Sequence, residues 1–397
     1  MQMLVESLGG AALAIWIYLL AGRGGFWRVR PERGGTRGAA ASAPAVAAIV
    51  PARNEVEVVG RAVASLLAQE YAGRLHIFLV DDGSTDGTAE AARRAAQEAG
   101  ELQRLTVVRA RPLPEGWTGK VWAQAEGLRA AEGWGADYFL LTDADIAHGP
   151  RDLAELVARA QSGGYDLVSL MARLSCTQPV ERALIPAFVF FFFMLNPPTW
   201  VAARRRGTAA AAGGCMLVRR EALERIGGMA AIRGELIDDC ALARAVKREG
   251  AIWLGAAEET RSLRAYSGWR EIGGMIARTA FRQLRHSVLL LAATLAGMAL
   301  TFLAPPLVVV AGGWAAVHGS PLWPALLGGM AWALMSLCYL PTLRYYGCSP
   351  YWAPLLPLIA CFYIGATIYS AILYWRGSGG QWKGRIQDSS AQEETSG

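Results

Sequence analysis

One long apolar stretch constrains the fold of this chain more than any other feature. Between Ser287 and Trp375 the only formally charged residue is Arg344, and breaks that contain Pro and Gly divide the stretch into three parts. Each part is close to the ~20 residues with which an α-helix crosses a bilayer. Helices of a soluble core are the alternative, but helices that are apolar on every side for this length have few places in a soluble fold. We expect membrane helices over residues 288–312, 322–343 and 351–375.

The N-terminal part of the chain predicts one more membrane helix. Residues 8–22 are apolar, no basic residue precedes them and arginines follow them, which favours an uncleaved anchor over a signal peptide. Arginines also precede the C-terminal apolar stretch, so the positive-inside rule places the middle of the chain in the cytoplasm. The arginines at these two borders are Arg23, Arg28, Arg30, Arg33 and Arg37, and Arg261, Arg264, Arg270, Arg278, Arg282 and Arg285.

Composition and charge narrow the class of protein further. Of the 397 residues, 53% are hydrophobic and 18% are charged, which is apolar for a soluble enzyme. The net charge of +6 is concentrated at the membrane borders, so anionic membrane lipids are better partners than nucleic acid, for which no binding module is present. Four spans would put the basic C-terminal tail outside, so either one segment is re-entrant or the number of spans is not four. Six cysteines without metal-ligand spacing are typical of reduced thiols.

The middle of the chain alternates between strand and helix patterns. Apolar runs at residues 46–50, 75–80, 105–108 and 138–141 predict buried strands, and residues 59–67, 88–99 and 121–131 between them have helical periodicity. This alternation predicts an α/β, Rossmann-like domain with a mainly parallel sheet and helices on both faces. Such sheets bind ligands at the carboxyl ends of their strands. Arg53, Asp82 and Asp145 fall at those ends.

Two aspartates follow the strand at residues 138–141. Side chains at i and i+2 of an extended segment point the same way, so Asp143 and Asp145 can share one hard divalent cation. Mg²⁺ held by so few ligands usually also binds substrate phosphates, which suggests a nucleoside-diphosphate donor. Alternatively the two aspartates are favoured by the dipole of a helix that Pro150 opens at its first position.

A second apolar segment, residues 184–200, is rich in Phe and interrupted by Pro186, Pro197 and Pro198. This pattern suits neither a clean span nor a surface helix, and we expect the segment to rest at the membrane interface. An ordinary buried helix is the alternative. The chain then divides into an N-terminal anchor, a basic Gly- and Ala-rich linker, an α/β domain, C-terminal membrane helices and a polar tail. Their respective ranges are residues 1–22, 23–44, 45–286, 287–375 and 376–397.

Several motifs of the α/β domain together resemble family 2 glycosyltransferases of the GT-A fold, over roughly residues 45–290. They are Pro51-Ala52-Arg53-Asn54-Glu55, the loop 81–88, Gly119-Lys120-x-x-Ala123 and Asp143-Ala144-Asp145. Within that family, four further segments look like the members associated with hopanoid biosynthesis. These segments are residues 185–190, 211–215, 237–242 and 283–287.

The resemblance implies a nucleotide-sugar donor bound with Mg²⁺ or Mn²⁺. Asp82 would bind the base or ribose, Asp145 would be the principal metal ligand and Asp143 would bridge donor and metal. Pro51, Ala52 and Glu55 would form the first loop of the donor pocket, and Lys120 would offset phosphate charge. Alternatively Asp82 caps the next helix, a role that Asp86 or Thr88 fits better, and Glu55 and Lys120 are solvated side chains.

By the same resemblance, Asp238 and Asp239 are paired acids ahead of a helix, and Asp239 is the candidate general base of an inverting transfer. Helix capping by Asp238 is the alternative, and both roles are compatible. Arg282-x-x-Arg285-His286 resembles the family's (Gln/Arg)-x-x-Arg-Trp motif. Because His286 replaces the Trp, Arg285 is the stronger candidate for a donor-phosphate contact, although anchoring at the membrane border alone explains Arg282 and Arg285.

These motifs predict a multi-pass enzyme of a bacterial-type inner membrane with its catalytic domain in the cytoplasm. It would be an inverting hexosyltransferase that moves sugar from a nucleotide diphosphate to a lipid acceptor, possibly a hopanoid. A polyprenyl-phosphate glycosyltransferase or a polysaccharide synthase is the alternative within the family, although three or four spans offer little material for a polysaccharide channel. A membrane scaffold with a degenerate nucleotide pocket is the non-enzymatic alternative, against which the intact carboxylates argue.

Overall fold

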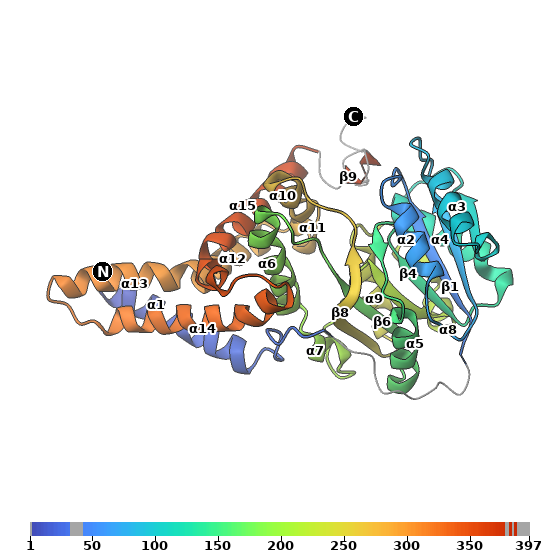
Figure 1. The fold of residues 1–397 in the computed structure, drawn as a ribbon. Coiled ribbons are helices and arrows are strands. Elements are labelled where there is room, and N and C mark those ends of the chain that lie inside the picture. Colours follow the sequence, from blue (N-terminus) through green and yellow to red (C-terminus); the bar gives the residue numbers. More distant parts are fainter. Residues whose placement is uncertain (1, 32–42, 378–380, 383–384, 387–397) are drawn as a thin grey trace. The chain divides into compact units, whose positions relative to one another are not determined.

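The computed structural model describes residues 2–31, 43–377, 381–382 and 385–386. These residues fall into two compact units, which we call the helical unit and the α/β unit (Figure 1). The helical unit consists of Met1–Arg30, Cys176–Thr199 and Tyr266–Gly380, and the α/β unit consists of Pro31–Ser175, Trp200–Ala265 and Gln381–Gly397.

The α/β unit is built on an eight-stranded sheet with the order β3-β2-β1-β4-β7-β6-β8-β5. The pairs β1–β2, β1–β4, β2–β3 and β6–β8 are parallel, whereas β7 runs antiparallel to β4 and β6, and β5 runs antiparallel to β8. The predicted mainly parallel α/β fold is therefore confirmed. The strands are β1 Val46–Ala52, β2 Leu75–Asp81, β3 Leu105–Arg109, β4 Tyr138–Thr142, β5 Ile146–Ala147, β6 Leu167–Arg173, β7 Cys215–Arg219 and β8 Ile252–Ser262.

Helices connect these strands close to the predicted positions. The α-helices are α2 Val59–Leu67, α3 Thr88–Glu98, α4 Gly119–Ala131, α5 Asp152–Gly163, α7 Pro198–Ala202, α8 Arg220–Arg225 and α9 Asp238–Lys247. Short 3₁₀ turns occur at Leu102–Arg104, Glu132–Trp134 and Gly228–Ile232. The prediction that Pro150 opens α5 is wrong, because the helix begins at Asp152, whose carboxylate accepts the backbone N–H of Gly149 at 2.7 Å.

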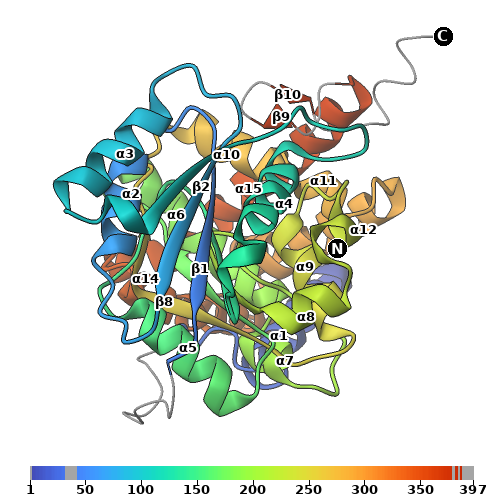
Figure 2. The ribbon, with the colours of Figure 1, turned by 90° about the vertical axis from the view of Figure 1, so that its right-hand side faces the viewer.

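The alternation of side chains along β1 explains why helices cover both of its faces. Val46, Ala48 and Val50 belong to the buried cluster that includes the apolar side chains of α2 and α5. On the other face, a Cβ placed on Gly127 of α4 would lie 2.5 Å from Ile49 Cγ2. Helix α4 therefore packs on the sheet at a distance that only glycine permits. Figure 2 shows α2 and α3 on one side of β1 and β2, and α4 on the other.

The helical unit consists almost entirely of apolar helices. They are α1 Gln2–Ala21, α6 Pro179–Leu195, α10 Trp269–Ala277, α11 Ala280–Gln283, α12 Val288–Met298, α13 Ala304–Val317, α14 Trp323–Tyr345 and α15 Leu356–Trp375, with a π-helical segment Ala299–Leu303 and a 3₁₀ segment Pro350–Leu355. Among the described residues, five helical segments are long and apolar enough to cross a membrane, which suggests a membrane protein. They are Gln2–Ala21, Pro179–Ala202, Val288–Val317, Trp323–Tyr345 and Pro350–Trp375.

Aromatic side chains hold the inner faces of these helices together. Trp16 lies edge-on to Phe302 at 5.7 Å between ring centroids, and its Nε1 donates to the Thr301 carbonyl at 2.8 Å. Phe191 of α6 contacts the same Phe302 ring at 5.3 Å. The outer faces are different, because large apolar side chains such as Leu289 (82% exposed) point away from the unit. Such faces suit a hydrocarbon environment.

The Phe-rich segment at residues 184–200 forms most of α6 and continues into α7. Its buried side chains include Ile185, Val189, Phe190 and Phe193, and Phe190 packs edge-on against Tyr339 at 5.2 Å. The segment is therefore a helix packed inside the helical unit despite Pro186 in its interior. Its location at a membrane interface stays a prediction.

Candidate active site

The loops that follow β1 and β2 are joined by hydrogen bonds at the carboxyl edge of the sheet. The backbone N–H of Asn54 donates to Ser84 Oγ at 3.0 Å, and the N–H of Thr85 donates to Asn54 Oδ1 at 3.0 Å. The N–H of Glu55 donates to Thr88 Oγ1 at 2.9 Å. Asn54 adopts a φ of 52°, a left-handed conformation that Asn tolerates better than most residues. The two loops therefore form one fixed surface.

Asp82 is buried within this surface, with 4% of its area exposed. Its N–H donates to the Ala52 carbonyl at 2.9 Å, and its Oδ2 lies 3.6 Å from Arg53 Nη1. Asp82 does not cap α3, because Gly87 occupies the N-cap position and Asp86, directly before it, accepts the N–H of Thr88 at 3.0 Å. The capping alternative for Asp82 is therefore excluded, and its carboxylate is held at the end of β2 by a guanidinium.

Asp143 lies in the turn between β4 and β5, next to a lysine from α4. Lys120 Nζ lies 2.8 Å from Asp143 Oδ1 and 3.4 Å from Asp238 Oδ2. Burial and the neighbouring Asp145 raise the pKa of Asp143 to about 6, although Lys120 opposes the shift. Burial would lower the pKa of Lys120, but the attraction of Asp143 and Asp238 outweighs it and raises that pKa above its usual value. Lys120 is thus a fixed cation between two acidic segments.

Asp145 is tied to the loop after β1 through an arginine that follows β8. Arg264 Nε donates to Asp145 Oδ2 at 3.0 Å, and its Nη2 donates to the Glu55 carboxylate at 3.0 and 3.1 Å. In the sequence, Arg264 stands only among the arginines of the membrane border. Its partners are 119 and 209 residues away in the chain, so no local pattern could have revealed this role.

Asp238 and Asp239 open α9, and neither caps it, because Ile237 occupies the N-cap position. Asp239 Oδ2 accepts the N–H of Gly213 at 2.9 Å, and its Oδ1 accepts the N–H of Cys240 at 2.6 Å. Burial and the neighbouring Asp238 raise the pKa of Asp239 to about 6, against the effect of Lys120. The capping alternative for Asp238 is therefore excluded.

Gly213 lies against both Lys120 and Asp239. A Cβ on Gly213 would lie 3.1 Å from Lys120 Nζ and 3.3 Å from Asp239 Oδ2. Hydrogen bonds thus link the Asp82 loop through Glu55 and Arg264 to Asp145. Asp145 stands two residues after Asp143, which contacts Lys120. Pro51 and Ala52 border this network, but they are buried inside β1 and do not belong to a loop, so only their backbone atoms can meet a ligand.

Arg282 and Arg285 belong to the helical unit. Arg282 lies in α11, and Arg285 and His286 follow it with φ angles of 53° and 54°. The ring of His286 stacks on Tyr374 with 3.9 Å between centroids. A donor-phosphate contact of either arginine stays a prediction.

Asp143 and Asp145 supply carboxylate oxygens, which are the ligands that a hard divalent cation prefers. Among the described residues, no three His, Cys, Asp or Glu side chains are grouped as metal ligands. Two carboxylates from one turn are nevertheless the hard oxygen donors with which proteins hold Mg²⁺ when substrate phosphates complete its coordination. The residues present therefore fit a cation that binds together with a diphosphate.

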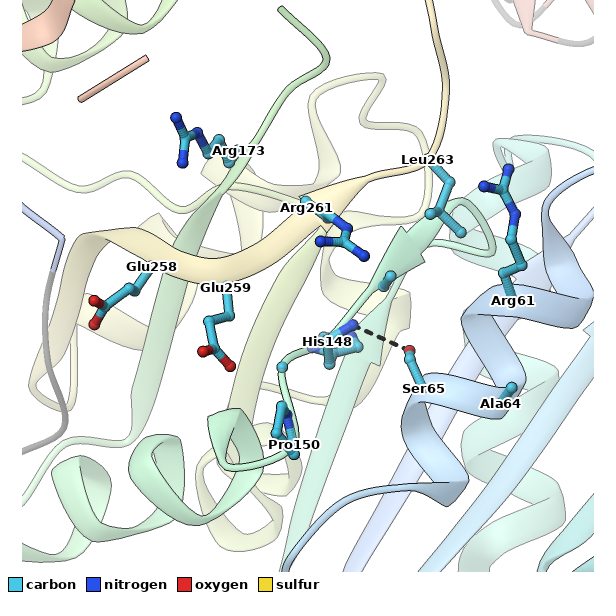
Figure 3. Close-up of a pocket in the computed structure, with 12 residues that line it drawn as sticks. Arg61, Ala64, Ser65, His148, Pro150, Arg173, Glu258, Glu259, Arg261 and Leu263 are labelled. Carbon is cyan, nitrogen blue, oxygen red and sulfur yellow. Dashed lines mark hydrogen bonds between the residues drawn. The ribbon is translucent and has the colours of Figure 1, made fainter. Parts of the chain in front are cut away.

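A separate pocket of about 650 Å³ lies in the α/β unit between α2, the residues that follow β5, and β8 (Figure 3). Its lining includes Arg61, Ser65, His148, Glu259 and Arg261. Sequence analysis did not single out these residues as a site. His148 at the pocket wall is itself buried, and burial lowers its pKa to about 4.

Comparisons with known proteins agree with this fold. A segment of 66 residues is 44% identical to an N-acetylglucosaminyltransferase of Rhizobium leguminosarum bv. viciae, and it spans only 16% of this chain and 16% of that protein. The fold is similar to a mannosyltransferase of Pyrobaculum calidifontis solved with GDP-Man and Mn²⁺, with a TM-score of 0.52, 22% identity, and 92% of this chain and 98% of that chain covered. Glucosyl-3-phosphoglycerate synthase from Mycobacterium tuberculosis overlaps more weakly, with a TM-score of 0.38, 19% identity, and 58% and 76% covered. Residues 47–227 match the family model "Glycosyl transferase family 2".

Proposed function

We propose that the chain is a membrane-bound, inverting glycosyltransferase that moves a hexose from a nucleoside-diphosphate sugar to a lipid hydroxyl. One observation carries the proposal. Lys120 contacts Asp143, at the predicted metal and diphosphate side, and Asp238, whose neighbour Asp239 is the predicted base. Lys120 thus contacts both the acid expected to assist departure of the diphosphate and the acidic pair that contains the predicted base.

The donor would bind across the carboxyl edge of the sheet, where Asp82 meets the base or ribose and Glu55 borders the pocket with the backbone of Pro51 and Ala52. Asp145 and Asp143 would hold Mg²⁺ or Mn²⁺. When bound, the cation neutralises the charge that develops on the departing diphosphate. The mannosyltransferase with a similar fold was solved with GDP-Man and Mn²⁺, a nucleotide sugar and a divalent cation, which are the two classes of ligand that this proposal requires.

Asp239 would accept the proton of the attacking hydroxyl. The acceptor oxygen forms a bond to the anomeric carbon on the face opposite the diphosphate, the bond from that carbon to the diphosphate oxygen breaks, and the proton passes to Asp239. A pKa of about 6 leaves this carboxylate mostly ionised near pH 7 yet more basic than an ordinary aspartate. The Gly213 N–H holds its Oδ2 in place.

A lipid acceptor accounts for the fusion of this domain to apolar helices. Within the part of the chain that the structure describes, five segments are long and apolar enough to span a bilayer. The arginine-rich borders favour a cytoplasmic catalytic domain beside anionic lipids. In this scheme residues 1–22 anchor the chain, residues 287–375 span the inner membrane, and Arg282 or Arg285 contacts the donor phosphates. Resemblance to hopanoid-associated members makes a hopanoid the first acceptor to test, and a polyprenyl phosphate the second.

The decisive experiment compares wild type with Asp239→Asn in nanodiscs, with a panel of labelled nucleotide sugars and a lipid extract. We expect wild type to label a lipid only with Mg²⁺ or Mn²⁺ present, and Asp239→Asn to lose about 10²- to 10⁴-fold in kcat. Asp166→Asn is the matched control, because Asp166 pairs with Arg225 elsewhere in the α/β unit. Equal transfer by both enzymes would remove Asp239 as the base. Absence of transfer by wild type with every donor would favour a scaffold.

A further inference from the structure

A buried histidine lies at the wall of the pocket of about 650 Å³. His148 follows β5, and its backbone N–H donates to Ser65 Oγ of α2 at 3.0 Å (Figure 3). Its ring Nε2 lies 2.9 Å from Thr142 Oγ1 at the end of β4. Only 7% of the residue is exposed. The residue is thus fixed at both its backbone and its ring.

The hydrogen bonds determine the direction in which the ring donates. The Thr142 hydroxyl has one hydrogen, and it donates that hydrogen to the Gly214 carbonyl at 2.8 Å. The hydroxyl must therefore accept from His148, which requires a hydrogen on Nε2. Because burial keeps the ring neutral, Nδ1 then carries no hydrogen. We call this chain of hydrogen bonds, from His148 through Thr142 to the Gly214 carbonyl, the relay.

Two residues of the relay, Thr142 and Gly214, are close in the chain to groups that adjoin carboxylates of the site. Thr142 directly precedes Asp143. Gly214 directly follows Gly213, whose N–H donates to Asp239 at 2.9 Å. The Thr142 hydroxyl therefore fastens the strand that precedes Asp143 to the loop that holds Asp239, and the imidazole of His148 orients that hydroxyl.

We propose that His148 is a positioning residue that sets the separation of Asp143 and Asp239 through Thr142 and Gly214. The inference rests on the proposed glycosyl transfer and adds a residue to its machinery that touches neither donor nor acceptor. A ring that only filled space would be better replaced by an apolar side chain, because a buried polar group costs free energy unless it is hydrogen-bonded. The ladder between β4 and β7 already pairs Thr142 with Cys215. The hydrogen bond from Thr142 to the Gly214 carbonyl continues that connection past the end of the ladder, toward Asp143 on one side and Gly213 on the other.

The test uses His148→Phe, which keeps a ring without the donor, and His148→Gln, whose amide nitrogen can restore one. Thr142→Val removes the next group of the relay with little change in shape. We expect His148→Phe and Thr142→Val each to lower kcat about 10- to 100-fold with the donor KM within about twofold, because a misplaced base slows the reacting step and leaves donor binding intact. His148→Gln should recover most of kcat. His76→Phe is the matched control, since His76 bonds Thr106 elsewhere in the sheet.

The double variant His148→Phe/Thr142→Val separates this relay from independent damage. Because both changes cut one relay, the double variant should be no slower than the slower single variant. Losses that multiply, or equal losses in His148→Phe and His148→Gln, would overturn the proposal. If His148→Phe fails to fold, Thr142→Val alone tests the relay. Its kcat should fall while its KM for the donor stays within about twofold of wild type.

A readout independent of turnover distinguishes this inference from the proposed function. Hydrogen exchange at residues 211–216 should quicken in Thr142→Val relative to wild type, because Gly213 loses its fixed position. Unchanged exchange would overturn the positioning role even if wild type transfers sugar. Quickened exchange with an inactive wild type would support the relay while the proposed function fails.

Discussion

At the scale of single residues, the site concentrates negative charge around one cation. Asp143, Asp238 and Asp239 surround Lys120, and the raised pKa values of Asp143 and Asp239 mean that folding holds both carboxylates in surroundings that disfavour ionisation. Groups perturbed by burial and by like charges are typical of functional sites. At neutral pH these two carboxylates therefore lower the free energy of unfolding of the protein.

Asp239→Asn should therefore be stabilising at neutral pH. The folded pKa of Asp239 is about 6 and its ordinary value is 3.8, so the folded state binds this proton more tightly than the unfolded state. The stability that the carboxyl contributes is complete below about pH 4 and is lost as pH rises through about 6. Asn stays neutral throughout, so the Tm of Asp239→Asn relative to wild type should be higher at pH 8 than at pH 4.5. Thermal unfolding at both pH values, with Asp166→Asn as control, measures this difference. A difference that shrinks as pH rises would contradict it.

At the scale of elements, local periodicity was enough to find most of the α/β unit. The strands at β1, β2, β3 and β4 and the helices between them lie within a few residues of their predicted ranges. Sequence analysis did not anticipate that β7 separates β4 from β6, or that β5 pairs with β8, because strand order depends on contacts between distant segments. It also misplaced the start of α5, since Pro150 lies in the turn before the helix and Asp152 supplies the stabilising carboxylate.

The fit of α4 on the sheet gives a prediction at this scale. In Gly127→Ala the new Cβ would lie 2.5 Å from Ile49 Cγ2 and 2.8 Å from Val80 Cγ2, so α4 must shift. We expect a loss of about 1–3 kcal/mol in unfolding free energy and a lower kcat, because α4 carries Lys120. Gly133→Ala is the matched control, since its Cβ would meet nothing within 4 Å. Thermal unfolding and turnover measure both effects. If Gly127→Ala were as stable as wild type, α4 would have room for the added Cβ, and the close packing inferred from these distances would be wrong.

At the scale of the whole molecule, apolar side chains on the outer faces of the helical unit are left largely uncovered by the described residues. Leu289, Val310 and Val317 are 82%, 70% and 83% exposed. Burying such area is worth about 25 cal/mol per Å², so helices that expose it in water would associate or aggregate. Lipid is the environment that removes this cost.

We expect the full chain to sediment with membranes and to stay there after washing with alkaline carbonate, which releases peripheral proteins. Removing residues 2–21 should not release it, because four other apolar segments remain among the described residues. Immunoblots of pellet and supernatant measure this, with a known peripheral protein as control. Release by alkali would mean that another protein covers these faces.

The sequence by itself determined the parts of this protein that depend on local order. Apolar runs of helical length predicted membrane helices, and short apolar runs alternating with period-3.6 patterns predicted an α/β unit. Motifs a few residues long singled out Asp82, Asp143, Asp145 and Asp239. Only the tertiary structure decided which groups meet: Arg264 with Glu55 and Asp145, Lys120 with two acidic segments, and His148 with Thr142. These contacts depend on strand order and helix packing, and chain segments brought together by folding leave no periodic trace in the sequence that connects them.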